Sequence, residues 1–354
     1  MKWAAAQRGF GVPFPMLNRR YIGICAASLA LAALMAACSS SGVPTTSPTL
    51  APSSSPSRTP SPTPKPTPTP SPSPSPSASL DLFVVNSCCL QGGDGWLSVF
   101  APPYTGNATA TIAMSPESTD IAFCPNGDLA IASLGIIGDP SIAVAYPPHY
   151  TTGAGETIGF GLSEPEGLAC NASDNLFVAN YGNNTVQEYA PPYTGMPIAT
   201  ITNGVNEPRG LAFNASGDLF VGNYGTSTVQ EYAPPYTGAP VATISNGVSQ
   251  PYGVAFDAKG DLFVSNPQAG TITEYAAPYT GAPTATVTDG LNDPVGITVD
   301  ASGILFVANG GNDTLTEYAP PYTGAPVATI TNNDKQPNNV KAPGGLAFGL
   351  YTPF

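Results

Sequence analysis

The feature that most constrains the fold of this chain is an internal repeat. Two series of residues recur at intervals of 43 positions: Pro165, Pro208, Pro251 and Pro294, and Tyr189, Tyr232, Tyr275 and Tyr318. A fixed period near 40 residues is typical of propellers and solenoids. Each unit contains four short β-rich runs separated by Gly, Pro, Asn and Asp, and none of these runs has a helical period. We therefore predict one four-stranded sheet for each unit.

The apolar pattern within a unit predicts how the sheets pack. Residues 208–213 and 218–223 are almost continuously apolar, whereas residues 228–232 mix polar and apolar side chains. Inner strands that are buried on both faces, with outer strands only partly covered, suit blades packed face to face around an axis. The sequence therefore predicts an all-β propeller.

The number of strands predicts the number of blades. The second strand of the unit occurs at six places: Asp81, Asp128, Asn175, Asp218, Asp261 and Ile304. The first strand also occurs at six places: Ile121, Leu168, Leu211, Val254, Ile297 and Leu346. The repeat region thus enters on a second strand and leaves on a first strand. We predict a six-bladed β-propeller of four-stranded blades, closed by the C-terminal strand at residues 344–348, which leaves no open sheet edge.

The motifs of one unit resemble NHL repeats. Residues 208–213 read Pro-x-Gly-Leu-Ala-Phe, residues 214–221 read Asn-Ala-Ser-Gly-Asp-Leu-Phe-Val, and residues 228–232 read Thr-Val-Gln-Glu-Tyr. The resemblance covers nearly everything after residue 80 and implies a propeller. The sequence departs from the usual NHL pattern at four positions, where Asn replaces Asp: Asn180, Asn223, Asn266 and Asn309.

The N-terminus has the layout of a secretory signal. Arg19 and Arg20 precede an apolar run over residues 21–37, and Cys38 follows it. Residues 34–38 resemble the bacterial lipobox, with Met35 where Leu is usual, which implies lipidation of Cys38. The alternative is an ordinary signal peptide cut before Cys38, which would leave a simple thiol. Translation could also begin at Met16.

We predict three parts: a lipoprotein-type signal peptide at 1–37, a stalk at 38–79 and the NHL-like propeller at 80–354. The stalk is Ser/Pro/Thr-rich and cannot build a core, so we expect it to be disordered. Alternating prolines favour polyproline II, and about 40 residues at roughly 3.1 Å each span on the order of 100 Å. We expect an exported protein, lipid-anchored to a membrane, on the cell surface or the periplasmic side.

The charge balance excludes some partners. The formal net charge is −13, with 23 acidic and 10 basic residues. Such a balance repels phosphate backbones and anionic headgroups, so we expect no nucleic acid and no membrane contact except through the lipid anchor. We expect a monomer.

Histidine chemistry has almost no basis in this sequence. His149 is the only histidine, so zinc held by several histidines, as in some propeller lyases, is not available. Lactonase-like propellers instead bind a divalent ion at the axis with Glu, Asn and Asp. Here the corresponding mouth positions include Glu166, Arg209, Tyr252 and Val295, and a carboxylate beside a guanidinium is expected to form a pair rather than a chelate. We therefore predict no catalytic residues, no metal and no cofactor.

The cysteines leave several pairings open. Export favours oxidation, so a bridge between Cys124 and Cys170 or a vicinal bridge between Cys88 and Cys89 would be possible. Cys124 and Cys170 could equally remain buried thiols. A repeated Pro-Pro-Tyr-Thr-Gly turn, as at residues 234–238, is interpreted as packing for the outer hairpin, with ligand contact as the alternative.

Two insertions distinguish the first two blades from the near-identical others. Residues 87–96 include Leu90 and Trp96, and residues 134–140 include Ile136 and Ile137. Apolar and aromatic residues in exposed loops are typical of a binding face, although the loops could instead fold inward and plug the channel.

We therefore predict a ligand site from these anchors and three mouth residues: Trp96, Leu90, Ile136, Ile137, Glu166, Arg209 and Tyr252. The predicted function is a binding or scaffolding propeller for an unknown protein, peptide or glycan. The alternative is a metal-dependent lactonase-like or lyase-like enzyme, which three or more converging Asp, Glu or Asn side chains would favour.

Overall fold

The computed structural model describes residues 80–87, 95–104, 106–115, 117–134, 142–146, 155–158, 160–331 and 340–350. All of them belong to one of two units of the chain, Ser71–Phe354. The predicted signal peptide, the predicted stalk and Cys38 lie outside the described residues. No helix in the described ranges has the length and apolar character needed to cross a bilayer.

The described residues form six four-stranded sheets, which we number in chain order. Sheet 1 contains β24 (Pro343–Gly349), β1 (Asp81–Asn86), β2 (Gly95–Phe100) and β3 (Ala110–Met114). Sheet 2 contains β4 (Ser118–Phe123), β5 (Leu129–Ser133), β6 (Ile142–Tyr146) and β7 (Glu156–Ile158). Sheet 3 contains β8 (Pro165–Cys170), β9 (Leu176–Asn180), β10 (Thr185–Tyr189) and β11 (Ala199–Ile201).

The remaining sheets follow the same order. Sheet 4 contains β12 (Pro208–Phe213), β13 (Leu219–Asn223), β14 (Thr228–Tyr232) and β15 (Ala242–Ile244). Sheet 5 contains β16 (Val254–Phe256), β17 (Leu262–Asn266), β18 (Thr271–Tyr275) and β19 (Ala285–Val287). Sheet 6 contains β20 (Pro294–Val299), β21 (Leu305–Asn309), β22 (Thr314–Tyr318) and β23 (Ala328–Thr331). Two 3-10 helices, η1 (Tyr181–Asn183) and η2 (Pro267–Ala269), follow β9 and β17.

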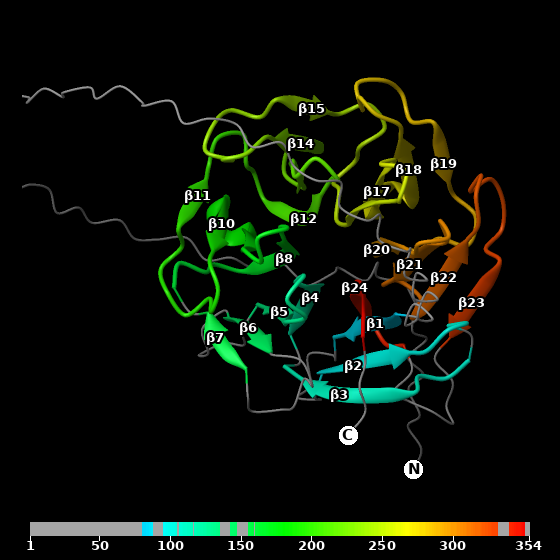
Figure 1. Ribbon diagram of the computed structural model, residues 1–354. Helices are drawn as coiled ribbons and strands as arrows, with labels where there is room; N and C mark the ends of the chain where they lie inside the picture. The colour runs from blue at the N-terminus through cyan, green and yellow to red at the C-terminus, as the bar shows by residue number, and fades with distance from the viewer. Residues whose placement is uncertain are drawn as a thin grey trace, which may run out of the picture. The chain divides into compact units, whose positions relative to one another are not determined.

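The sheets surround a common axis. Their first strands contact one another in the cyclic order β4, β8, β12, β16, β20 and β24. Figure 1 shows the sheets arranged around this centre. This confirms the predicted all-β propeller with four-stranded blades. Strand β24, near the end of the chain, pairs antiparallel with β1, and Leu82 lies opposite Phe348 in that register. Segments from both ends of the repeat region thus share one sheet.

Aromatic side chains fill the seams between neighbouring sheets. Phe220 of β13 is fully buried, and its ring centroid lies 4.8 Å from that of Phe256 and 5.2 Å from that of Tyr279, both in sheet 5. Both contacts are edge-to-face, an arrangement that the ring quadrupoles favour. Phe177 makes the same contacts with Phe213 and Tyr236 across the seam between sheets 3 and 4. The repeated sequence therefore produces a repeated seam.

The Pro-Pro-Tyr turns contribute to this core. Tyr236 is buried, and its hydroxyl donates to Gly217 O at 2.9 Å, in the turn between the first two strands of the same sheet. Tyr193, Tyr279 and Tyr322 donate to the equivalent carbonyls of their own sheets. The structure thus supports the interpretation of these tyrosines as packing residues.

The asparagines at the ends of the second strands each accept a hydrogen bond from a backbone N–H group. Asn223 is fully buried; its Oδ1 accepts from Asn206 N at 2.8 Å, and its Nδ2 donates to Val221 O at 3.4 Å. A carboxylate has no N–H to donate and would bury a charge. The amide of Asn223 can therefore both accept and donate at this buried position.

A disulfide links two sheets. Cys124 follows β4 and Cys170 ends β8, and their Cα atoms lie 5.1 Å apart. Of the pairings that the sequence left open, the structure selects this bridge for these two cysteines. Cys88 and Cys89 lie outside the described residues.

Candidate binding site at the channel mouth

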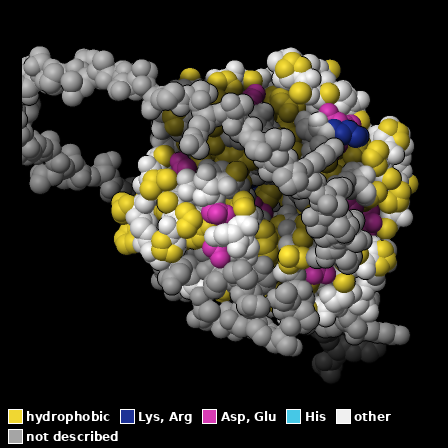
Figure 2. All heavy atoms as spheres, in the orientation of Figure 1, with side chains coloured by type: hydrophobic (Ala, Val, Ile, Leu, Met, Phe, Trp, Pro, Cys, Tyr) yellow, Lys and Arg dark blue, Asp and Glu magenta, His cyan; other side chains and the backbone are white. Residues whose placement is uncertain are grey.

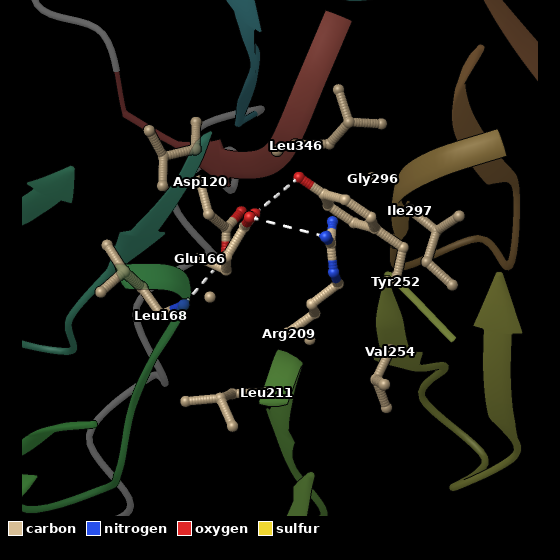
Figure 3. Close-up of a pocket in the computed structure, with 15 residues that line it drawn as sticks. Asp120, Glu166, Leu168, Arg209, Leu211, Tyr252, Val254, Gly296, Ile297 and Leu346 are labelled. Carbon is tan, nitrogen blue, oxygen red and sulfur yellow. Dashed lines mark hydrogen bonds and ion pairs between the residues drawn. The ribbon is translucent and has the colours of Figure 1, made fainter. Parts of the chain in front are cut away.

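Three of the predicted site residues meet at one end of the axis. Glu166 lies in β8, Arg209 in β12, and Tyr252 just before β16. The Arg209 Nη2 atom is 3.7 Å from Glu166 Oε1, and the Tyr252 hydroxyl donates to Glu166 Oε2 at 2.9 Å (Figure 3). The side chains of Glu166 and Arg209 are each only 8 % exposed. The predicted pairing of carboxylate and guanidinium is therefore present, and it is largely shielded from water.

Three tyrosine rings surround the guanidinium of Arg209. Its Cζ atom lies 4.9 Å from the ring centroid of Tyr181, 4.5 Å from that of Tyr224 and 4.6 Å from that of Tyr252. Cations are attracted to aromatic faces at such distances. All three tyrosines are half-buried, so part of each remains accessible. One carboxylate and three rings thus hold a single positive charge at the mouth.

Sequence reasoning missed Tyr181 and Tyr224. Each follows the asparagine that ends a second strand. Tyr181 lies in sheet 3, and Tyr224 lies in sheet 4, which also contains Arg209. The corresponding positions in sheets 5 and 6 hold Pro267 and Gly310. This difference between otherwise similar units is the sequence signal that could have identified Tyr181 and Tyr224 as site residues.

Below the mouth lies a cavity of about 80 Å³. Its lining includes one glycine in or just before the first strand of each of five sheets: Gly167, Gly210, Gly253, Gly296 and Gly345. A Cβ atom at Gly167 would lie only 1.8 Å from Arg209 O in the next sheet. The first strands can therefore approach one another only because these positions are glycine. Aliphatic residues, among them Leu168 and Ile297, also line the cavity.

Asp120 interrupts this ring of glycines. It lies opposite Ala132 in sheet 2, the place that Gly167 takes opposite Ala179 in sheet 3. Asp120 Oδ2 accepts from Leu168 N at 2.9 Å (Figure 3). Burial raises the pKa of Asp120 to about 7, and the nearby negative charge of Glu166 adds to the rise. Aligning the first strands would have revealed this substitution, which sequence reasoning missed.

Of the four predicted apolar anchors, only Trp96 belongs to the described residues. Leu90, Ile136 and Ile137 lie outside the described residues. The placement of Trp96 in an inserted loop was wrong, because Trp96 is the second residue of β2 and pairs with Asn86. It occupies the register position that Thr185 takes opposite Asn180 in sheet 3. Its side chain is half-buried and lies on a third strand, away from the axis.

The carboxylates at this site are few. Asp120 and Glu166 are the two in the cavity lining, and no set of three or more His, Cys, Asp or Glu residues suited to a metal occurs in the described ranges. On the face seen in Figure 2, acidic side chains lie in separate spots among apolar and uncharged atoms. The arrangement suits a binding pocket better than a chelating one.

Comparison with known proteins supports the fold class. No family model matches the chain, and no curated protein matches it. Among solved structures, the nidogen/laminin complex matches with a TM-score of 0.59 at 16% identity, covering 77% of this chain and 98% of the other. A Bacteroides caccae protein of unknown function matches with a TM-score of 0.57 at 16% identity, covering 77% and 99%.

A third similar structure is virginiamycin B lyase from Staphylococcus aureus. It has a TM-score of 0.50 at 12% identity and covers 66% of this chain and 77% of the other. At these identities the similarity is informative about the fold alone. The similar structures include one of a binding complex and one of an enzyme, so the function must be argued from the site.

Proposed function

We propose that this chain is a binding or scaffolding propeller whose protein, peptide or glycan ligand docks at the mouth of the axial channel. One observation carries the proposal: the shielded Glu166–Arg209 pair with three half-buried tyrosines around the guanidinium. Tyr and Arg are enriched among residues that dominate binding energy. A preorganised arginine keeps the rings in place, so little side-chain entropy is lost when a ligand covers them.

The enzyme alternative has less support. A metal-dependent lactonase-like or lyase-like reaction would use three or more converging oxygen ligands, and the cavity lining offers the carboxylates of Asp120 and Glu166. One of these, Glu166, is already engaged by Arg209 and Tyr252. The geometry therefore favours binding.

Capture with the full chain as bait tests the ligand site. Tyr224→Ala should weaken the interaction with any captured partner roughly thirtyfold, since large aromatic anchors often contribute about 2 kcal/mol. Ile198→Ala is the matched control, because Ile198 is exposed just before the fourth strand of sheet 3. Trp96→Ala tests the sequence-based anchor. Equal capture by the wild type and Tyr224→Ala would place the site elsewhere.

We also propose that the six sheets act as the blades of one closed NHL-like ring, completed by β24. Deleting residues 344–354 would remove most of a strand that pairs with β1 and contacts β4 and β20. The truncated chain should lose cooperative unfolding, whereas a control lacking only residues 350–354 should retain it. An unchanged melting temperature in the longer deletion would refute the closed ring.

Finally, we propose export and lipid anchoring at Cys38, with residues 38–79 as the stalk. The support is the lipobox-like run at residues 34–38 and the Ser/Pro/Thr-rich segment behind it. Cys38→Ser should release the protein from the membrane fraction, because a multiply acylated cysteine partitions stably and an unmodified chain does not. A mature N-terminus at another residue would contradict the anchor.

A further inference from the structure

The cavity below the mouth carries an uncompensated acidic group. Glu166 is neutralised by Arg209, but none of the ion pairs among the described residues includes Asp120. The other titratable residue in the lining is Tyr252, and the first strands β20 and β24 contribute only glycine and aliphatic residues. With Asp120 ionised, the lining therefore holds one net negative charge.

The shape and polarity of the cavity limit what could balance this charge. Its volume of about 80 Å³ is several times the roughly 10–15 Å³ that one water molecule requires, so it can hold a molecule of a few heavy atoms. Its lining combines the carboxylates of Asp120 and Glu166 with aliphatic side chains, including those of Leu168, Leu211 and Ile297. Carboxylates and aliphatic side chains thus line the same small space, as Figure 3 shows.

We propose that this cavity binds a small primary alkylammonium ion, with its ammonium group donating to Asp120 and its short alkyl tail against the aliphatic residues. An ammonium donates several hydrogen bonds, which suits carboxylate acceptors, and its single charge neutralises the site. A divalent metal would instead require more oxygen ligands than the two carboxylates present. The inference deepens the proposed function, because it rests on the axial channel being the ligand site and names the chemistry of its inner part.

The position of Asp120 provides a variant with little risk of misfolding. The other five sheets carry glycine at this position, so Asp120→Gly introduces the residue that already fits the close approach of the first strands. Asp120→Asn is a second variant, which keeps an oxygen acceptor for Leu168 N while removing the charge. Neither variant changes Arg209, Tyr181 or Tyr224.

The test measures the melting temperature of the purified full chain with ethylammonium chloride, with sodium chloride and tetramethylammonium chloride at the same concentration as references. Ethylammonium should raise Tm by at least about 2 °C near pH 8, where Asp120 is ionised, and by less near pH 6. Both Asp120 variants should lose this response. Tetramethylammonium has no N–H group to donate and should have no specific effect.

Several results would overturn the inference. It is wrong if the rise in Tm with ethylammonium persists in both variants, or if tetramethylammonium or sodium raises Tm equally. It is also wrong if ethylammonium does not raise Tm at all. A response to calcium chloride without a response to ethylammonium would identify a metal site instead. If partner capture depends on Tyr224 while ethylammonium has no effect, the proposed function stands and this inference falls. If ethylammonium binds but no mouth variant affects capture, the proposed function falls.

Discussion

Glu317 of β22 gives the sharpest prediction about stability. The residue is 8% exposed, and no donor among the described residues reaches its Oε1 atom. In sheet 3 the equivalent Glu188 accepts from Asn175 Nδ2 at 2.7 Å, but the residue at the position of Asn175 in sheet 6 is Ile304. Burial raises the pKa of Glu317 to about 7, and the negative charge of Asp300 adds to the rise.

The sign of the pH dependence follows from this pKa. The folded state holds the Glu317 proton more tightly than the unfolded state, in which the pKa is near 4.5. The stability contributed by the protonated group is thus full below about pH 4.5 and is lost as the pH rises through about 7. A rise from 4.5 to about 7 corresponds to at most about 3 kcal/mol, and residual water access reduces this.

Glu317→Gln should therefore be more stable than the wild type above about pH 7, with the advantage fading toward about pH 4.5. Urea unfolding followed by circular dichroism at a series of pH values measures the difference in free energy of unfolding. Ile304→Asn is the matched rescue, because it should supply the amide donor that Asn175 provides in sheet 3 and lower the pKa of Glu317. A difference between Glu317→Gln and the wild type that does not change with pH would refute this reasoning.

Three further predictions concern the axis and its crosslink. Replacing both Cys124 and Cys170 with serine should lower the free energy of unfolding, measured in urea, by about 2 to 4 kcal/mol, because the bridge closes a loop across a sequence separation of 46. An unchanged free energy of unfolding would mean that the bridge does not form in solution. Glu166→Gln should destabilise the fold by about 3 kcal/mol, since it leaves the charge of Arg209 buried without its carboxylate, and a thermal shift detects this. Gly167→Ala should reduce the soluble folded yield sharply, because its Cβ would overlap Arg209 O, and a normal melting curve would contradict the close approach of the strands.

Much of this architecture could be predicted from the sequence. The strands of each unit, their order and the position of Glu166, Arg209 and Tyr252 at one end of the first strands follow from the repeat. These properties depend on local sequence pattern and on strand register. Because the same pattern occurs in every unit, comparing the units is enough to infer them. The packing role of the Tyr236 type of turn could be inferred for the same reason.

Which side chains meet was decided only by the tertiary structure. It brings Tyr181 of sheet 3 onto Arg209 of sheet 4 and places Asp120 among the glycines of the axis. Within single sheets, it places Tyr224 against Arg209 and leaves Glu317 Oε1 with no donor among the described residues.

Two further details also required the structure, namely the bridge between Cys124 and Cys170 and the place of Trp96 in a strand rather than a loop. The physical reason is that side-chain distances across a seam depend on how far apart the backbones of neighbouring sheets lie. A repeat pattern determines which strand a residue joins, but the separation between the sheets emerges only when all of the seams pack together.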